Sequence, residues 1–237
     1  MSPRHALIVG GARGIGRAVG ADLLARGWRL SIAGRSSRAE ELEAAGASWH
    51  PVDASDPVAC RALIAATDPI DALVIAAGPY HRVPLLQESD EGWRDMFANN
   101  LDPVFFLAQA ALPGMKARGW GRIVTFSMAN ADKLQANPMV TAHYIAKVGV
   151  LALTRTLAKA GARCGVTSNC VSPGFLDSGS APAEELDAMR DKIPARRIGT
   201  LDDAVHAVRY LLSDEASYVN GANLHVSGAW GLSLIHI

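Results

Sequence analysis

The chain contains a cluster of glycines whose spacing suits the binding of phosphate groups: Gly10, Gly14 and Gly16, with Arg13 and Ile15 between them. The cluster directly follows a short apolar run and opens a segment of helical character. Glycines permit a tight turn there and let backbone N–H groups approach a diphosphate at the positive end of a helix. On a strand–turn–helix near the N-terminus, this spacing predicts a dinucleotide site rather than a turn without a ligand.

The end of the second apolar run indicates which dinucleotide binds. NAD sites usually carry a carboxylate about 20 residues beyond the glycines, whereas NADP sites offer an arginine. Here the run ends in Arg35, Ser36 and Ser37, with no carboxylate at the turn. Arg35 can bind a 2′-phosphate through two hydrogen bonds, the serines can donate to it, and Arg13 can approach it from the other side. We therefore predict NADP(H) as the cofactor.

The elements that must position these residues follow a regular order. Apolar runs that are mostly continuous rather than alternating indicate strands buried on both faces of a parallel sheet. The predicted strands are residues 6–9, 29–33, 49–52, 72–76, 122–126, 167–171 and 224–226. The predicted helices are residues 14–26, 38–45, 57–66, 90–116, 141–160 and 201–212. This alternation predicts the α/β class, with a three-layer, doubly wound parallel sheet (a Rossmann fold) in a single domain over residues 1–231.

Charge and composition exclude several classes of partner. Lys plus Arg and Asp plus Glu balance at 23 each, so no electrostatic reason exists to expect nucleic acid or an anionic membrane. No segment approaches the roughly 20 apolar residues of a membrane span. The 3 cysteines form no paired motif, and the histidines have no metal-ligand spacing. We expect a cytoplasmic protein that holds no metal.

Two segments stand apart from the regular pattern. Residues 174–200 contain prolines and several charges after the sixth strand, and would overhang the carboxyl ends of the strands, where ligands bind in open α/β sheets. They predict a substrate lid, with a plain surface loop as the alternative. Residues 232–237 resemble the translated end of a sequencing adapter, so we expect them to be a non-native tail and the natural C-terminus to lie just after Gly231.

The chain resembles the short-chain dehydrogenases/reductases over essentially its whole length, from Ala6 to Gly231. The motifs that carry the resemblance are the glycine loop, Asp53, Ala77-Gly78, Asn100-Leu101, Lys147 and Asn169-x-x-x-Pro173-Gly174. The resemblance implies a nicotinamide-dependent oxidoreductase. It also implies a homodimer or homotetramer, because the long helices predicted at residues 90–116 and 141–160 resemble the pair that forms oligomers in this family.

The resemblance also assigns roles in cofactor binding. It implies that Asp53 binds the adenine and that Gly78, with Ala77, lines the adenosine pocket. The Pro173-Gly174 segment would cradle the nicotinamide, with Ser178 in place of a usual threonine on its amide. These assignments belong to the family and are carried over to the matching positions of this sequence.

The catalytic motif departs from the family pattern. Hydride transfer to a carbonyl leaves an oxyanion, which needs a proton donor and a cation or dipole. The family supplies Tyr-x-x-x-Lys on one helix face and a serine from the preceding strand end. Here Lys147 matches, but His143 stands at the tyrosine position and Tyr144 follows it; Met128 stands at the serine position and Ser127 precedes it.

Three interpretations stay open. In the first, Tyr144 takes over as the donor, because positions three and four before a lysine both lie on its helix face. In the second, His143 is the acid, although a nearby ammonium disfavours a protonated imidazole. In the third, the chain binds NADP(H) and does little or no chemistry. In the family, the position of Asn100 distorts the helix and holds a water on the proton path to Lys147. Pro103, three residues on, fits a local break in that helix.

A broken motif of this kind also occurs in one branch of the family. Gly78-Pro79-Tyr80, Trp120-Gly121-Arg122 and the altered serine and tyrosine positions resemble the reductases that finish the aminopentanol modification of elongation factor P. Tyr80 and His81, at the mouth of the expected cleft, are alternative donors. We expect an NADPH-dependent reductase of a small-molecule carbonyl substrate, with a catalytically weak or inactive NADP(H)-binding protein as the alternative.

Overall fold

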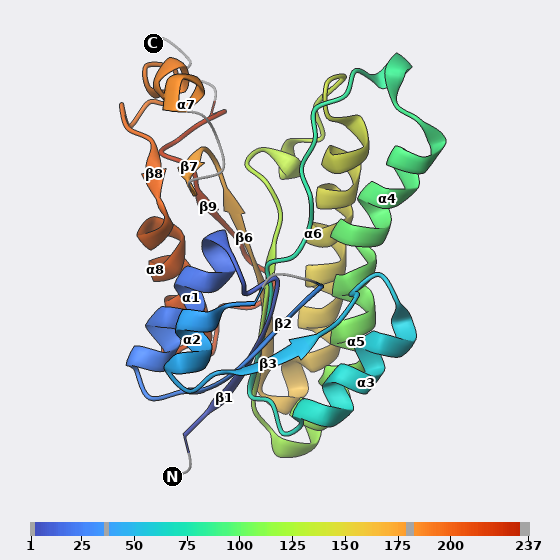
Figure 1. The fold of residues 1–237 in the computed structure, drawn as a ribbon, viewed down its shortest axis with the longest axis vertical. Coiled ribbons are helices and arrows are strands. Elements are labelled where there is room, and N and C mark those ends of the chain that lie inside the picture. Colours follow the sequence, from blue (N-terminus) through green and yellow to red (C-terminus); the bar gives the residue numbers. More distant parts are fainter. Residues whose placement is uncertain (1–2, 36–37, 179–182, 233–237) are drawn as a thin grey trace.

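The chain folds around one parallel sheet of seven strands in the order β3-β2-β1-β4-β5-β6-β9 (Figure 1). The computed structural model describes residues 3–35, 38–178 and 183–232. Every pairing in this sheet is parallel, and the order reverses between β1 and β4, which is the doubly wound arrangement. The predicted Rossmann fold in a single domain is confirmed.

All seven predicted strands are present, with small shifts at their ends. Their bounds are β1 His5–Val9, β2 Arg29–Gly34, β3 Ser48–Pro51, β4 Ala72–Ile75, β5 Gly121–Phe126, β6 Val166–Pro173 and β9 Asn223–Val226. Every residue of β1, β4 and β5 is buried. This burial on both faces explains why their apolar runs are continuous rather than alternating.

Helices cover both faces of the sheet (Figure 1). One face carries α1 (Gly14–Ala25), α2 (Glu40–Ala44) and α8 (Leu201–Leu212), and the other carries α3 (Pro57–Thr67), α5 (Asp102–Arg118) and α6 (Thr141–Gly161). Each face has its own hydrophobic core cluster, one built with α1 and α8 and the other with α3, α5 and α6. The site therefore rests on a rigid three-layer scaffold.

The long helix predicted at residues 90–116 is divided into α4 (Asp90–Asn100) and α5 (Asp102–Arg118), which meet at Leu101. Pro103 stands in the first turn of α5, where its missing N–H costs nothing, and cannot continue the ladder of α4. The local break that Pro103 predicts in this helix is confirmed, and it divides the predicted segment into two helices. The break leaves Asn100, the last residue of α4, buried against the loop that follows β4.

The segment after β6 contains short elements that the sequence did not indicate. β7 (Leu176–Asp177) pairs with β8 (Gly199–Thr200), and α7 (Ala183–Arg190) lies between them. Figure 1 shows α7 at the same end of the molecule as the N-terminal end of α4. The lid role of residues 174–200 stays a prediction, and residues 179–182 of this segment lie outside the described part of the chain. Residues 233–237 of the predicted non-native tail lie outside it as well.

None of the helices in the described part of the chain is both long enough and apolar enough to span a bilayer.

Candidate active site

The glycine turn between β1 and α1 is held by close backbone approaches. Gly10 has a φ of 84°, and a Cβ there would stand 2.6 Å from the backbone nitrogen of Ala77. A Cβ on Gly16 would overlap the carbonyl oxygen of Gly10. Only glycine fits at both positions, because backbone occupies the space that a side chain would need.

The N-terminus of α1 is open to an anion. Arg13 is its N-cap residue, and its side chain makes no capping hydrogen bond; the first turn contains no acidic residue. The first N–H groups of a helix have no partner within the helix and carry a partial positive charge. The turn at Gly14, whose φ is 51°, therefore offers backbone donors that fit a diphosphate.

The predicted 2′-phosphate contacts lie at the ends of β1 and β2. Arg13 and Arg35 are both exposed, and within the described residues no hydrogen bond engages either guanidinium. Arg35 lies close enough to Asp53 to help lower the pKa of that carboxyl, although hydrogen bonds from Ser55 are the larger cause. The predicted contact Ser36 lies outside the described residues.

In the predicted adenosine pocket, the backbone of Gly78 lies against the side chain of Asn100 on α4. Gly78 has a φ of 139°, and a Cβ there would overlap the side-chain oxygen of Asn100. The Asn100 amide nitrogen donates to the carbonyl oxygen of Pro79 at 3.1 Å. The buried Asn100 Oδ1 accepts no hydrogen bond from the described residues. Asn100 thus fixes the start of the loop that follows β4.

The predicted nicotinamide cradle stands at the carboxyl end of β6. The backbone N–H of Gly174 donates to the carbonyl of Val226 at 2.9 Å, which ties the end of β6 to β9. A Cβ on Gly174 would stand 2.9 Å from the Cα of Ser227. Pro173 and Ser178 are half-buried in the same segment. The cradle residues are therefore close to the carboxyl edge of the sheet, as the sequence predicts.

Lys147 lies deep in the site. Its side chain is 7% exposed, and its ammonium donates to the carbonyl oxygen of Phe126 at 3.1 Å, at the end of β5. Burial lowers the pKa of Lys147 to about 8. A lysine with this pKa can hold or release a proton near neutral pH.

The two hydroxyls nearest the motif positions are both engaged elsewhere. The Tyr144 hydroxyl accepts the backbone N–H of Gln135 at 2.9 Å, and its ring belongs to the hydrophobic core cluster beneath α6. The Ser127 hydroxyl donates to the carbonyl oxygen of Lys147 at 2.8 Å. The burial of the Tyr144 ring in the core argues against the interpretation that Tyr144 donates the proton, although its hydroxyl keeps its own proton when it accepts from Gln135. The hydrogen bond of Ser127 gives that residue a role in holding α6.

His143 is the residue of the pair that contacts the loop after β4, through the ring of Tyr80. Its side chain is 7% exposed, and its buried Nδ1 has no hydrogen-bond partner in the described residues. Burial, with smaller contributions from Lys147 and His81, lowers the pKa of His143 to about 3. The imidazole is therefore neutral at neutral pH and carries one N–H.

The loop after β4 brings further polar groups to His143. The ring of Tyr80 packs edge-to-face on His143, with 5.1 Å between the ring centroids. His81 Nε2 stands 3.7 Å from a carboxylate oxygen of the nearly buried Glu88. Sequence reasoning named Tyr80 and His81 but missed Glu88, because no spacing relates it to α6.

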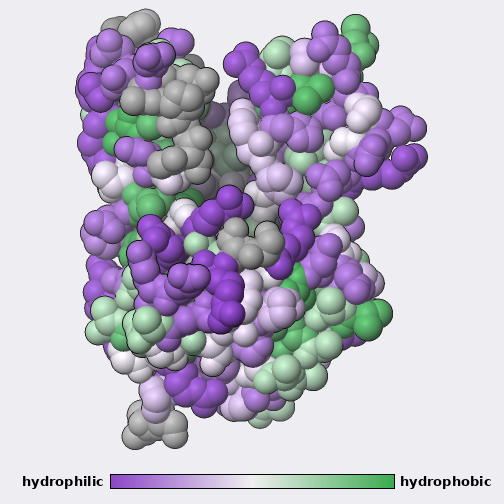
Figure 2. All heavy atoms as spheres, viewed as in Figure 1, coloured by the Kyte–Doolittle hydropathy of each residue, from purple (hydrophilic) through white to green (hydrophobic). Residues whose placement is uncertain are grey.

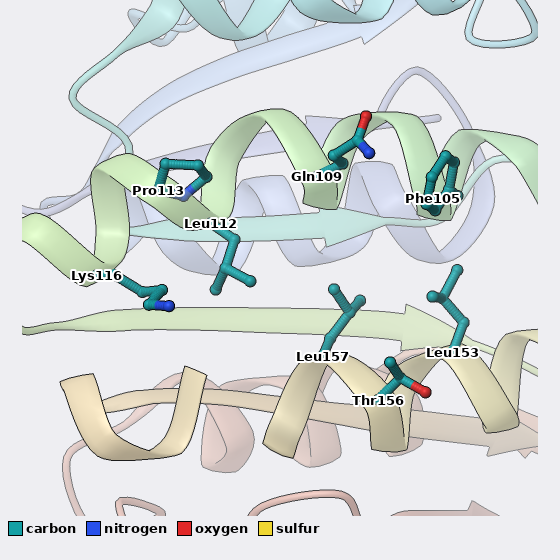
Figure 3. Close-up of a pocket in the computed structure, with 8 residues that line it drawn as sticks. All are labelled: Phe105, Gln109, Leu112, Pro113, Lys116, Leu153, Thr156 and Leu157. Atoms are coloured by element: carbon teal, nitrogen blue, oxygen red, sulfur yellow. The ribbon is translucent and has the colours of Figure 1, made fainter. Parts of the chain in front are cut away.

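A recess separates the part of the molecule that carries α7 from the part that carries α4 (Figure 2). A different hollow, of about 470 Å³, lies between α5 and α6 (Figure 3). It is lined by Phe105, Gln109, Leu112, Pro113, Lys116, Leu153, Thr156 and Leu157. None of these residues belongs to the predicted site, so the hollow is not the candidate active site.

The sheet order and the glycine turn define a Rossmann-type α/β protein, and comparison with known proteins narrows this class. A family model described as enoyl-(acyl carrier protein) reductase matches residues 10–230. The chain belongs to the short-chain dehydrogenase/reductase family. Within the described residues, no group of three or more His, Cys, Asp or Glu side chains is placed to hold a metal ion.

Named relatives match almost the full chain. The 3-oxoacyl-(acyl-carrier-protein) reductase FabG of Salmonella typhimurium is 33% identical over 240 residues, covering 94% of this chain and 95% of its own. An acetoacetyl-CoA reductase of Rhizobium meliloti is 32% identical over 236 residues, covering 95% of this chain and 97% of its own. A solved structure titled short chain dehydrogenase/reductase family protein superimposes with a TM-score of 0.88 at 31% identity, covering 96% of this chain and 98% of its own. These likenesses support an oxidoreductase that acts on carbonyl groups.

Proposed function

We propose that this protein is an NADPH-dependent reductase that converts a carbonyl group of a small molecule to an alcohol. The observation that carries the proposal is the buried pair on α6, in which Lys147, with a pKa of about 8, follows the neutral His143 by one helical turn. A cation and a fixed N–H donor are what an oxyanion requires as it forms. The names of the relatives agree with this chemistry.

The cofactor in this proposal is NADP(H). Arg13 and Arg35 stand at the turns after β1 and β2 with no carboxylate at the end of β2, so a 2′-phosphate would meet two guanidinium groups. Ser36 would add a hydroxyl donor. When bound, the cofactor supplies a hydride to the carbonyl carbon.

The remaining cofactor contacts follow the geometry of the carboxyl edge. The diphosphate would lie on the N–H groups between Gly10 and Gly16, including that of Ile15. The adenosine would lie against Asp53 and the Ala77-Gly78 turn, and the nicotinamide would lie against Pro173, Gly174 and Ser178. These residues come from the ends of adjacent parallel strands, which is where dinucleotides bind in this fold.

His143 and Lys147 have different roles toward the carbonyl oxygen of the substrate. The neutral His143 donates a hydrogen bond to the carbonyl oxygen without carrying a charge, since its pKa of about 3 keeps the imidazolium away. Lys147 stabilises the negative charge that develops on that oxygen and holds the cofactor ribose. Residues 174–200 cover the substrate as a lid, and two or four copies of the chain assemble through α5 and α6.

The experiment that tests this proposal titrates purified protein with NADPH and NADH and follows NADPH oxidation with acetoacetyl-CoA, ethyl acetoacetate and benzaldehyde. Arg13→Ala and Arg35→Ala should each weaken NADPH about tenfold or more and leave NADH unchanged. The exposed Arg163 in the short turn after α6 provides the control, and Arg163→Ala should change neither. A preference for NADH would contradict the cofactor assignment.

A second candidate function is a non-catalytic protein that binds NADP(H). The observation in its favour is that the Ser127 hydroxyl donates to the backbone carbonyl of Lys147, while Tyr144 is buried in the core with its hydroxyl accepting a backbone N–H. Tight NADPH binding without turnover on any of the three carbonyl compounds would establish this candidate and remove the reductase.

A further inference from the structure

Tyr80 extends from the loop that follows β4 and stands over the catalytic face of α6. Its side chain is 64% exposed, and its ring meets His143 at an interplanar angle of 88°. The phenol ring is therefore held against the imidazole. No described residue forms a hydrogen bond with the Tyr80 hydroxyl, so its proton is free to meet a ligand.

The loop that carries Tyr80 is fastened at three points. The Asn100 amide donates to the carbonyl of Pro79, the residue before Tyr80. Val83 forms an isolated parallel bridge with Val140, the N-cap residue of α6, and the backbone N–H of Leu85 donates to Pro138 at 2.8 Å. The loop that carries Tyr80 is thus tied both to α4 and to the segment that leads into α6.

Tyr80 is also the one tyrosine whose hydroxyl is available beside His143. The chain has 4 tyrosines. Tyr144 is buried, with its ring in the hydrophobic core cluster and its hydroxyl accepting the backbone N–H of Gln135. Tyr210 lies on α8, on the face of the sheet opposite α6, and the exposed Tyr218 follows the end of α8. The phenol that family members carry on α6 is replaced here by an imidazole, and a phenol from the neighbouring loop packs against that imidazole.

We propose that the Tyr80 hydroxyl is the proton donor of the reduction, acting from the loop after β4 in place of the missing tyrosine on α6. The hydride from NADPH forms the new C–H bond as the carbonyl π bond breaks, and the electron pair passes to oxygen. That oxygen takes the proton of the Tyr80 hydroxyl, and the resulting phenolate regains a proton from water, to which it is exposed. This assignment rests on the proposed reductase function, and Asn100 is a positioning residue for it.

The test compares Tyr80→Phe with Tyr218→Phe. Phenylalanine at position 80 keeps the ring that packs on His143 and removes only the hydroxyl. Tyr218→Phe is the matched control, because it removes a hydroxyl from a tyrosine that is 99% exposed and lies elsewhere. Tyr80→Phe should lower kcat about 100-fold with ethyl acetoacetate, or with acetoacetyl-CoA or benzaldehyde where the wild type prefers one of these. The dissociation constant of NADPH should stay within about twofold, because the hydroxyl does not contact the cofactor in this proposal.

A binding measurement separates proton donation from a packing role. The alcohol product of the preferred compound (ethyl 3-hydroxybutyrate for ethyl acetoacetate), titrated into the NADP⁺ complex, should bind about tenfold more weakly to Tyr80→Phe, since one hydrogen bond to its oxygen is lost. An unchanged kcat in Tyr80→Phe, or a loss equal to that in Tyr218→Phe, would overturn the assignment. Absence of turnover in the wild type would instead overturn the proposed function and this role with it.

Discussion

At the scale of single residues, the site contains two basic side chains, and burial lowers the pKa of each. Lys147 has its pKa lowered to about 8 and His143 to about 3, in both cases chiefly through burial. The carbonyl of Phe126 satisfies the Lys147 ammonium, whereas Nδ1 of His143 has no partner in the described residues. The pair therefore supplies one positive charge and one neutral donor on a single helix face.

Replacing Lys147 tests whether its positive charge stabilises the oxyanion that forms during the reduction. Lys147→Met should lower kcat with the preferred carbonyl compound about 100- to 1000-fold, because the oxyanion loses its cation. Steady-state kinetics with NADPH measure the change. Lys159→Met, at an exposed position on the same helix, should leave kcat unchanged. Equal activity in both variants would contradict the role of Lys147.

The variant Lys147→Met also tests how much the burial of the Lys147 ammonium lowers the stability of the fold. A lysine whose pKa falls from 10.5 in the unfolded chain to about 8 in the folded one binds fewer protons when folded, so stability rises with pH between these values. The difference in unfolding free energy between the wild type and Lys147→Met should therefore change in favour of the wild type as the pH rises from 8 to 10.5. Urea unfolding over this range measures the gain, and parallel curves would show that the ammonium is not desolvated.

His143 should make the fold sensitive to acid. With an unfolded pKa of 6.5 and a folded pKa of about 3, the unfolded chain binds the extra proton, so stability falls as pH drops from 6.5 toward 3. The expected slope is about 1.4 kcal/mol per pH unit. His143→Phe should remove this component in urea unfolding curves, and a substitution of the exposed His206, His206→Gln, should not. Identical slopes in the wild type and His143→Phe would contradict the burial of His143.

At the scale of elements, the sequence predicts whatever depends on a repeating pattern. Continuous apolar runs place the central strands, because burial on both faces leaves few polar positions. The edge strands β3 and β9 contain no buried residue and follow from their place in the alternation of strands and helices. Pro103 also marks the break that divides residues 90–116 into α4 and α5, because a proline cannot continue the hydrogen-bond ladder of the preceding helix. Sequence reasoning missed α7, because a helix of 8 residues with charged side chains at half of its positions carries no clear apolar period.

The candidate site divides in the same way. The glycine turn could be predicted because backbone contact demands glycine at fixed spacings. The choice between His143 and Tyr144 could not, since both spacings share a helix face with Lys147. What bears on this choice is the burial of Tyr144, whose hydroxyl accepts the N–H of Gln135 from the segment before α6. A hydrogen bond between a helix and the irregular chain that precedes it leaves no periodic trace in the sequence.

The turn into α1 yields a prediction at this scale. Gly14 has a φ of 51°, and a Cβ there would meet no atom within 4 Å, so Gly14→Ala should cost only the strain of the left-handed conformation, about 1 kcal/mol. Gly16→Ala must displace the Gly10 carbonyl and should cost about 3 kcal/mol. Chemical unfolding measures both. A smaller loss in Gly16→Ala than in Gly14→Ala would show that the turn is not closed as described.

At the scale of the whole molecule, the two edges of the sheet serve different purposes. The carboxyl edge carries the residues that we propose to bind the cofactor and the substrate. The opposite edge, at the start of β5, is closed by Trp120, whose ring lies 4.1 Å from the Arg4 guanidinium carbon and 4.4 Å from that of the buried Arg122. Asp214 accepts hydrogen bonds from Arg4 and Trp120. These contacts stabilise the scaffold away from the ligand-binding edge, which leaves the carboxyl edge free for function.

The remaining surface feature is the apolar hollow between α5 and α6, toward which Leu112, Leu153 and Leu157 point (Figure 3). Phe105 is exposed at its margin, and burying such a face against a second copy would remove apolar area from water. We predict that the wild type sediments as a dimer or tetramer in analytical ultracentrifugation, and that Leu153→Glu shifts it to the monomer, because the unpaired carboxylate would be buried in the interface. Leu86→Glu, at a position 97% exposed near the cleft, should sediment as the wild type does. A monomeric wild type, or an oligomer that Leu153→Glu leaves intact, would show that this face does not join the copies, and the leucines that α5 and α6 turn toward the hollow would then need another explanation.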